Sequence, residues 1–112
     1  MKKILIALSV LATTQIAMAT ATPITTIKDI YVYETSVVIK LANQHTNPDI
    51  CTHPKAKEYL LLSTDTAGGN RLYSAILSAY VSGKKVRFGY KNCANWSATE
   101  TVPKAYGVSM VE

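Results

Sequence analysis

The N-terminal segment determines how much of this chain is left to fold. An apolar stretch runs from Ile4 to Ala12 behind two lysines, and small residues stand at Ala17-Met18-Ala19. A basic start, a short apolar region and a small-residue site are the three parts of a cleaved secretory signal peptide. We therefore expect residues 1–19 to be a signal peptide and residues 20–112 to form one exported domain. A second cleavage register, ending at Ala21, stays open.

Size and charge narrow the classes of function. The apolar stretch is shorter than the roughly 20 residues that a membrane-spanning helix needs, so no membrane span is expected. Without the two leader lysines, ten Lys and Arg residues face seven Asp and Glu residues, with no basic run longer than two. Nucleic-acid binding requires a concentrated basic patch, so no nucleic-acid partner is expected. The predicted location is the periplasm or the medium outside the cell.

Cys51 and Cys93 are the only cysteines of the chain. An even number of cysteines in an exported protein predicts a disulfide, because the compartment is oxidising. Closing a loop of about 43 residues should stabilise the fold by about 4 kcal/mol. A metal or catalytic cysteine is disfavoured, since there is no C-x-x-C motif and His45 and His53 lack ligand spacing. We expect no metal and no cofactor.

Alternating apolar residues predict most of the secondary structure as strands. A first strand is expected within residues 24–33 and a second at Val37–Leu41, separated by a short turn. Residues 43–57 are polar and hold two prolines, which predicts a loop. The run at residues 58–63 has strand length, although its periodicity leaves a helix open. Two more strands are predicted, at residues 85–90 and 105–111.

One amphipathic helix is predicted at Arg71–Ser82. Thr64-Asp65-Thr66 can cap its N-terminal end, and Gly83 stands where a C-terminal cap is expected. The pair Gly68-Gly69 would weaken a helical turn and can instead mark a close backbone approach. The apolar side of the helix is expected to contain four residues: Leu72, Ile76, Leu77 and Tyr80.

The element order is three strands, one helix and two strands, so the chain is expected to be mainly β with one helix. This is the order of the five-stranded OB barrel, β-β-β-α-β-β, in which the helix covers one end. An open α+β sheet with the helix on one face has the same elements and stays open as an alternative.

The second half of the chain resembles a known family. Residues 72–88 combine a Leu-Tyr-Ser helix, a Ser-Gly turn and a Val-Arg strand, with Trp96 downstream and a last strand at residues 106–110. This pattern resembles the small OB-fold B subunits of bacterial A/B-type toxins, such as the subtilase-cytotoxin and pertussis-like B subunits. It is also similar to a set of small exported proteins of unknown role. The resemblance covers about residues 58–111 and consists of packing and turn residues, so it bears on fold more than on activity.

The resemblance implies a ring of five identical subunits around a central pore, an enzymatic A subunit as partner and binding to cell-surface glycans. Two features depart from the family. The toxin subunits that bind sialoglycans carry aromatic sugar-binding residues ahead of the first strand, whereas Thr20–Thr26 contains no aromatic residue. A second, C-terminal cysteine pair also has no counterpart here. A glycan site, if present, is therefore expected elsewhere.

Trp96 is the best candidate for stacking on a sugar, because an aromatic face packs against the C–H side of the ring. It stands in the predicted loop Asn92–Thr101, among polar side chains that could bond hydroxyl groups: Asn92, Asn95, Ser97 and Thr99. Alternatively, Trp96 folds back over the end of the barrel, as buried tryptophans usually do. Tyr31 and Tyr33 lie two apart and share one strand face, either as a stacking pair or as core or interface residues.

No catalytic constellation is recognisable, because the carboxylates Asp49, Glu58, Asp65 and Glu100 are separated along the chain. The sequence therefore predicts an exported binding protein that is not an enzyme. Its small, weakly charged helix side would suit packing in a ring; the residues are Asn70, Ser74, Ser78 and Val81. The alternative is a monomeric periplasmic or secreted accessory or structural protein without catalytic activity.

Overall fold

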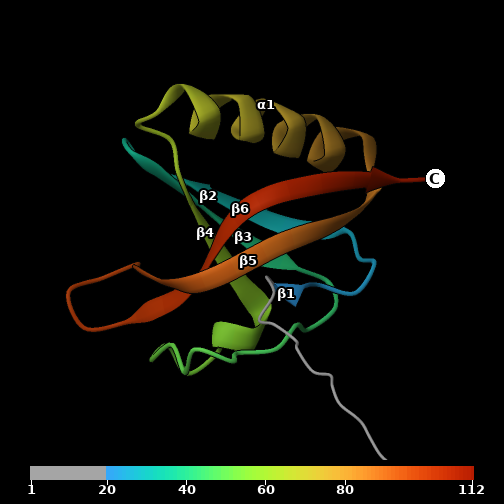
Figure 1. Ribbon diagram of the computed structural model, residues 1–112. Coiled ribbons are helices and arrows are strands. Elements are labelled where there is room, and N and C mark those ends of the chain that lie inside the picture. The colour runs from blue at the N-terminus through green and yellow to red at the C-terminus, as the bar shows by residue number, and fades with distance from the viewer. Residues whose placement is uncertain (1–19) are drawn as a thin grey trace, which may run out of the picture.

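The computed structural model describes residues 20–112, and the predicted signal peptide lies outside this range. Within it, the chain forms six strands, one α-helix and one 3-10 helix (Figure 1). In chain order these are β1 Thr20–Ala21, β2 Ile27–Val32, β3 Ser36–Leu41, η1 Ala56–Glu58, β4 Tyr59–Ser63, α1 Ala67–Ser82, β5 Lys85–Asn95 and β6 Thr101–Val111. None of the helices in this part of the chain has the length and apolar character needed to cross a membrane.

All six strands belong to one sheet, in the order β1-β5-β6-β4-β3-β2. Neighbours are antiparallel except β4 and β6, which are parallel and pair at Leu61 and Lys104. The prediction of a mainly β chain with one helix is confirmed, and the run at residues 58–63 forms a strand as expected. The sheet has six strands and is not closed, so the five-stranded barrel is not confirmed.

The additional strand, β1, lies ahead of the first predicted strand, which was expected within residues 24–33. Pro23 has no amide hydrogen to donate to a sheet, and it separates β1 from the next paired residues. The Thr22 N–H donates to the Phe88 carbonyl at 2.8 Å, and Thr25 and Val86 exchange two backbone hydrogen bonds of 2.9 and 2.7 Å. Residues 20–25 therefore lie along β5, near one end of the sheet. The chain then continues into β2, which is the strand at the other end of the sheet.

Helix α1 begins earlier than predicted and ends where predicted. Thr66, in the predicted capping segment, accepts a hydrogen bond from the Gly69 N–H through Oγ1 at 2.9 Å. This cap compensates for the weak helix propensity of the glycine pair, which lies inside the first turn. Gly83 adopts a φ of 68° and ends the helix in the left-handed conformation expected of a C-terminal glycine.

Helix α1 lies across one face of the sheet (Figure 1). Its inward stripe runs at spacings of three and four residues through Gly69, Leu72, Tyr73, Ile76 and Ala79. Two residues predicted to face the core, Leu77 and Tyr80, lie instead at the border of this stripe and are each 40% exposed. The stripe is centred on Ile76 because the small residues Gly69 and Ala79 let the helix approach the sheet.

Strands β5 and β6 form a hairpin that is longer than predicted. Each strand has 11 residues, so the predicted loop Asn92–Thr101 shortens to residues 96–100. The pairing shifts register at Gly89/Tyr90 and at Lys91/Cys93. The shift at Lys91/Cys93 leaves Asn92 without a partner and interrupts the alternation in β5, and Pro103 is an unexpected residue near the start of a strand. The continuation of both strands was therefore not visible as a period-two pattern.

Strands β3 and β4 are apolar on both faces because each face has its own core. On the helix side, Val37, Ile39, Leu60 and Leu62 pack with residues of α1, β5 and β6. Alternate residues pack on the opposite side in a smaller cluster: Val38, Tyr59, Leu61 and Val102, with Ala94 and Trp96 against them. This second core forms the base of the candidate site.

Candidate functional site

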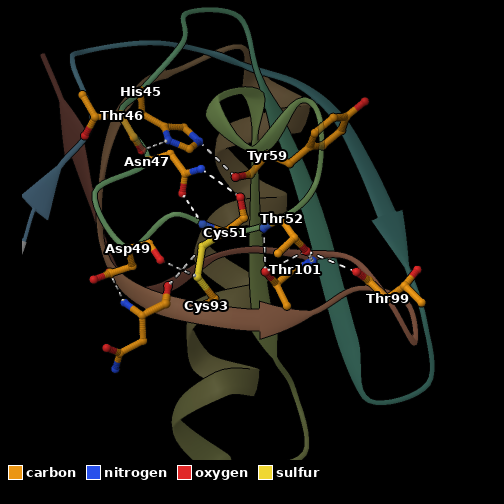
Figure 2. Close-up of a disulfide and its surroundings, with 11 residues drawn as sticks. His45, Thr46, Asn47, Asp49, Cys51, Thr52, Tyr59, Cys93, Thr99 and Thr101 are labelled. Atoms are coloured by element: carbon orange, nitrogen blue, oxygen red, sulfur yellow. Dashed lines mark hydrogen bonds between the residues drawn. A yellow bond between two sulfur atoms is a disulfide. The ribbon is translucent and has the colours of Figure 1, made fainter.

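The disulfide predicted between Cys51 and Cys93 is present, with a Cα–Cα distance of 5.6 Å. It ties the long loop between β3 and β4 to strand β5 (Figure 2). The closed loop is long, and in the chain-entropy model its closure stabilises the fold by about 4 kcal/mol. The bond therefore fixes a polar segment that has few apolar contacts of its own.

Hydrogen bonds hold the loop on both sides of the disulfide (Figure 2). The Asn47 side chain donates to the Cys51 carbonyl at 3.0 Å and accepts from the Cys51 N–H at 2.8 Å. Asp49 Oδ2 accepts from the Asn92 N–H at 2.8 Å. Ile50, between Asp49 and Cys51, has a φ of 54°, which is unusual for a β-branched residue. Its side chain is 82% exposed. The turn is therefore held in a strained conformation by its neighbours.

Thr52 and Thr101 join the end of this loop to the base of the β5–β6 hairpin. Each backbone N–H donates to the other residue's side-chain oxygen, both at 2.9 Å. The His53 N–H also donates to the Thr101 carbonyl, at 2.9 Å. These three bonds place the His53 ring beside the hairpin tip, where Trp96 begins the turn.

Five aromatic side chains meet at this point, and we refer to Tyr31, Tyr33, His53, Tyr59 and Trp96 as the aromatic cluster. The Trp96 ring stacks on His53 at 5.0 Å between centroids and lies 4.9 Å from Tyr59. Tyr31 meets Trp96 edge-on at 5.8 Å, and the indole Nε1–H donates to the Tyr33 hydroxyl at 3.1 Å. Strand β2, the disulfide loop, β4 and the hairpin tip therefore each contribute to one cluster.

The members of the aromatic cluster differ in exposure. Tyr59 is buried, while His53 and Trp96 are half-buried. Tyr31 and Tyr33 are 38% and 49% exposed, so they are the most exposed members of the cluster. Trp96 thus packs over the second core and also supports the tyrosine pair through its indole N–H. An exposed aromatic pair with hydroxyl groups is chemically suited to the C–H face and hydroxyls of a sugar.

Charged side chains border the aromatic cluster. Lys40 Nζ lies 3.8 Å from Glu58 Oε1 and 5.8 Å from the centre of the Tyr59 ring. Glu100 Oε1 lies 3.7 Å from His53 Nε2. Burial raises the pKa of the Tyr59 hydroxyl above its usual value, so this group stays neutral at physiological pH. The border therefore offers charged hydrogen-bonding groups around a neutral aromatic centre.

The other predicted site residues serve mainly to hold the local structure. Ser97 Oγ accepts from the N–H groups of Thr99 and Glu100, at 3.3 and 3.1 Å, and closes the turn. The Thr99 carbonyl accepts from the Thr52 hydroxyl at 3.2 Å. Asn92 and Asn95 belong to β5 rather than to a loop, and both are exposed.

The sequence prediction found Trp96, Tyr31 and Tyr33 but missed their two partners. Tyr59 was assigned only to a strand, and His53 was weighed only as a metal ligand. Tyr59 could have been found from its place beside the apolar run of β4, because it alternates with Leu60 and therefore faces the other side of the sheet. The position of His53 depends on the disulfide loop, whose path the sequence pattern does not define.

His45 occupies a separate, buried position at the start of the same loop. Its Nδ1 lies 2.9 Å from the Thr46 carbonyl and its Nε2 lies 3.0 Å from the Tyr59 carbonyl (Figure 2). Burial lowers the pKa of His45, and the two carbonyl oxygens oppose this effect only in part. The ring also lies 4.9 Å from the Tyr90 ring.

Metal and family comparisons add no assignment. In residues 20–112, no group of three or more His, Cys, Asp or Glu side chains is placed to hold a metal ion. Comparison of the chain with known protein families, curated proteins and solved structures found no match.

Proposed function

We propose that this protein is an exported, non-catalytic binding protein with an OB-like barrel. The order of elements along the chain supports this architecture, since β2, β3 and β4 are followed by α1 and then by β5 and β6. Residues 20–25 bond to β5 and continue directly into β2, which brings the two ends of the strand order close to each other. In an OB-like barrel, β1 and β2 together correspond to the first strand, which is interrupted between residues 21 and 27.

The ligand we propose is a cell-surface glycan bound at the aromatic cluster. The single observation that carries this proposal is the exposed pair Tyr31 and Tyr33, held in place by Trp96. Fixed aromatic rings lose little conformational freedom on binding, and their hydroxyl groups can bond to sugar hydroxyls. The disulfide and the Thr52–Thr101 bonds fix the loop beneath the cluster, so the surface is ordered before a ligand arrives.

Tyr33→Ala tests this proposal more cleanly than removal of Trp96, because Trp96 packs over the second core. Loss of one stacking ring should cost on the order of 1 to 3 kcal/mol, which would weaken a glycan interaction by about fivefold to 150-fold. The measurement is a glycan array followed by titration with the best glycan. Tyr106→Ala is the matched control, since Tyr106 is also 49% exposed but lies on β6, outside the aromatic cluster and the outer side of α1. Absence of glycan binding by the wild-type protein would contradict the proposal.

We also propose that the protein assembles as a homopentameric ring that carries an enzymatic A subunit. Two different surfaces support an assembly with head-to-tail contacts, which form a ring when the rotation between neighbouring subunits closes. The outward edge of β2 has no strand partner within residues 20–112 and carries the exposed Val32. The outer side of α1 exposes Leu77, Tyr80 and Val81. Apolar residues on an unpaired edge and on a helix are typical of subunit contacts.

The second candidate is a monomeric periplasmic or secreted accessory protein. The observation in its favour is that Trp96 already uses its indole N–H within the chain and packs against Tyr59. In that case the aromatic cluster is a second core with a structural role. The wild-type protein would then bind no glycan, and Tyr33→Ala would lower its free energy of unfolding.

A further inference from the structure

A groove of about 610 Å³ opens between α1 and β6, on the side of the sheet opposite the second core. This volume lies in the range of sites that bind small molecules or short peptide segments. The floor of the groove is apolar and consists of Leu62, Leu72, Ala75, Ala105 and Val108. The proposed glycan site does not use any of these residues.

The groove runs beside an open strand edge. Strand β4 pairs with β6 only at Lys104, and β4 ends at Ser63. Beyond Lys104, the side of β6 that faces away from β5 has no strand partner within residues 20–112.

The direction of the free backbone groups follows from the pairing of β5. Val86 and Phe88 direct their backbone groups toward residues 22–25, so Arg87 and Gly89 direct theirs toward β6. Their partners Ser109 and Gly107 therefore point to β5. By alternation, the amide and carbonyl of Val108 point away from β5 and into the open edge.

Two basic side chains line the same groove from different elements. Arg71 comes from α1 and Lys104 from β6, and both are exposed. Neither makes an ion pair with another side chain in the part of the chain that the structure describes. The first turn of α1 also contains no acidic residue. The nearest acids along the chain are Asp65 for Arg71 and Glu100 for Lys104, and neither lines the groove. Asp65 accepts a hydrogen bond from the Ser63 hydroxyl, and Glu100 lies beside His53.

We propose that this groove binds an extended acidic peptide segment of a partner protein. The segment pairs through its backbone with the open edge of β6, as in β-augmentation, where main-chain hydrogen bonds supply affinity and side-chain pockets supply specificity. Its apolar side chains occupy the floor beside Leu72 and Val108. Its carboxylates meet Arg71 and Lys104, which explains why these two cations face an apolar groove without a partner of their own.

A fluorescein-labelled heptapeptide of alternating Val and Glu tests the proposal by fluorescence anisotropy with the purified protein. The Val–Lys counterpart should bind at least tenfold more weakly, because Arg71 and Lys104 repel it. Two further peptides carry N-methyl groups on all Val or on all Glu backbone amides. One of these two peptides should bind at least tenfold more weakly than the unmethylated Val–Glu peptide, because backbone pairing uses only alternate amide groups. Equal binding of all four peptides would overturn the proposal.

The matched variants are Arg71→Glu with Lys104→Glu, and Lys28→Glu with Lys55→Glu. Both pairs change the net charge equally, but Lys28 and Lys55 are exposed outside the groove. Charge reversal in the groove should lower the affinity for the Val–Glu peptide at least tenfold. The double variant should then bind the Val–Lys peptide more tightly than the Val–Glu peptide. The control pair should keep the wild-type order of affinities. Far-UV circular dichroism establishes that both double variants fold.

Phosphatidylglycerol vesicles distinguish the peptide from a lipid surface. The wild-type protein should bind the Val–Glu peptide whether or not vesicles are present. Binding to vesicles that depends on Arg71 and Lys104, together with no binding of any peptide, would overturn the proposal in favour of an anionic lipid. An effect of the groove variants equal to that of the control pair would also overturn it, because net charge alone would then explain the binding.

Discussion

His45 links the protonation of one buried side chain to the stability of the disulfide loop. Its ring lies between the carbonyls of Thr46 and Tyr59 and beside the Tyr90 ring. A neutral imidazole has one N–H and can donate to only one of the two carbonyls. A protonated ring could donate to both, but it would be charged in a buried position. Burial has the larger effect, and it lowers the pKa of His45.

We predict that His45 makes the protein less stable in mild acid. The unfolded state binds a proton near pH 6.5, whereas the folded state binds it only at a lower pH. The contribution of His45 to stability is therefore fully present above about pH 6.5 and is lost as the pH falls through the folded-state pKa. Urea unfolding between pH 7.5 and pH 5 should show a decrease in the free energy of unfolding that is smaller in His45→Gln.

His53→Gln is the control for this measurement, because it removes the half-buried histidine of the aromatic cluster and leaves His45 in place. A decrease in mild acid that is reduced in His45→Gln but not in His53→Gln is assigned to the buried His45. If the wild-type protein instead gains stability relative to His45→Gln as the pH falls, the two carbonyl oxygens outweigh burial.

The candidate site could be predicted in part from single residues. Tyr31 and Tyr33 were recognisable because residues two apart share one strand face, and Trp96 because it stands alone in a polar segment. Their contact with His53 could not be predicted, since it depends on hydrogen bonds between Thr52 and Thr101. These residues are 49 positions apart, and pairing at this distance leaves no periodic pattern in the sequence.

At the scale of elements, the start of α1 is fixed by two adjacent glycines with different environments. A Cβ on Gly69 would lie 1.9 Å from the Ser63 carbonyl oxygen, so the helix could not approach β4 as closely. A Cβ on Gly68 would meet nothing within 4 Å. The close approach that the sequence suggested for this pair therefore applies to Gly69 alone.

The glycine pair gives a matched prediction. Gly69→Ala should lower the free energy of unfolding by about 2 kcal/mol or more, because backbone must move to relieve the clash. Gly68→Ala should raise it by about 0.5 to 1 kcal/mol, since alanine favours the helix and the site is open. Chemical denaturation of both variants measures the difference. Equal effects of the two substitutions would show that helix propensity, rather than contact with Ser63, determines stability here.

The elements themselves were predictable to different degrees. Strands β3 and β4, the end of α1 at Gly83 and the first half of β5 agree with the sequence pattern. Short apolar runs mark β3 and β4, a glycine cap marks the end of α1, and unbroken alternation marks the first half of β5. The second half of β5 and the first part of β6 were assigned to a loop. Their pairing contains the register shift at Lys91/Cys93 and places Pro103 opposite Cys93. Such irregular pairing is stabilised by the partner strand and the disulfide rather than by local preference.

At the scale of the whole molecule, the two cores lie beneath two different candidate surfaces. The core under α1 positions the groove beside β6, and the second core positions the aromatic cluster. The disulfide stabilises the side that lacks a helix, where a long polar loop would otherwise be loosely held. Sequence pattern predicted one apolar helix face but not the second core, because β3 and β4 appear as continuous apolar runs rather than as alternating ones.

The proposed ring can be tested by the mass of the protein in solution. If the protein forms a ring of five through the β2 edge and the outer side of α1, light scattering should report about five times the monomer mass at micromolar concentration. Val81→Glu should then lower the mass toward that of the monomer, because Val81 is 77% exposed on α1 and would place a charge in an apolar contact. Ile50→Glu is the matched control, since Ile50 is 82% exposed in the disulfide loop, and it should leave the mass unchanged. A monomeric wild-type protein at tens of micromolar would favour the accessory-protein alternative, because ring interfaces of this kind are extensive and persist on dilution.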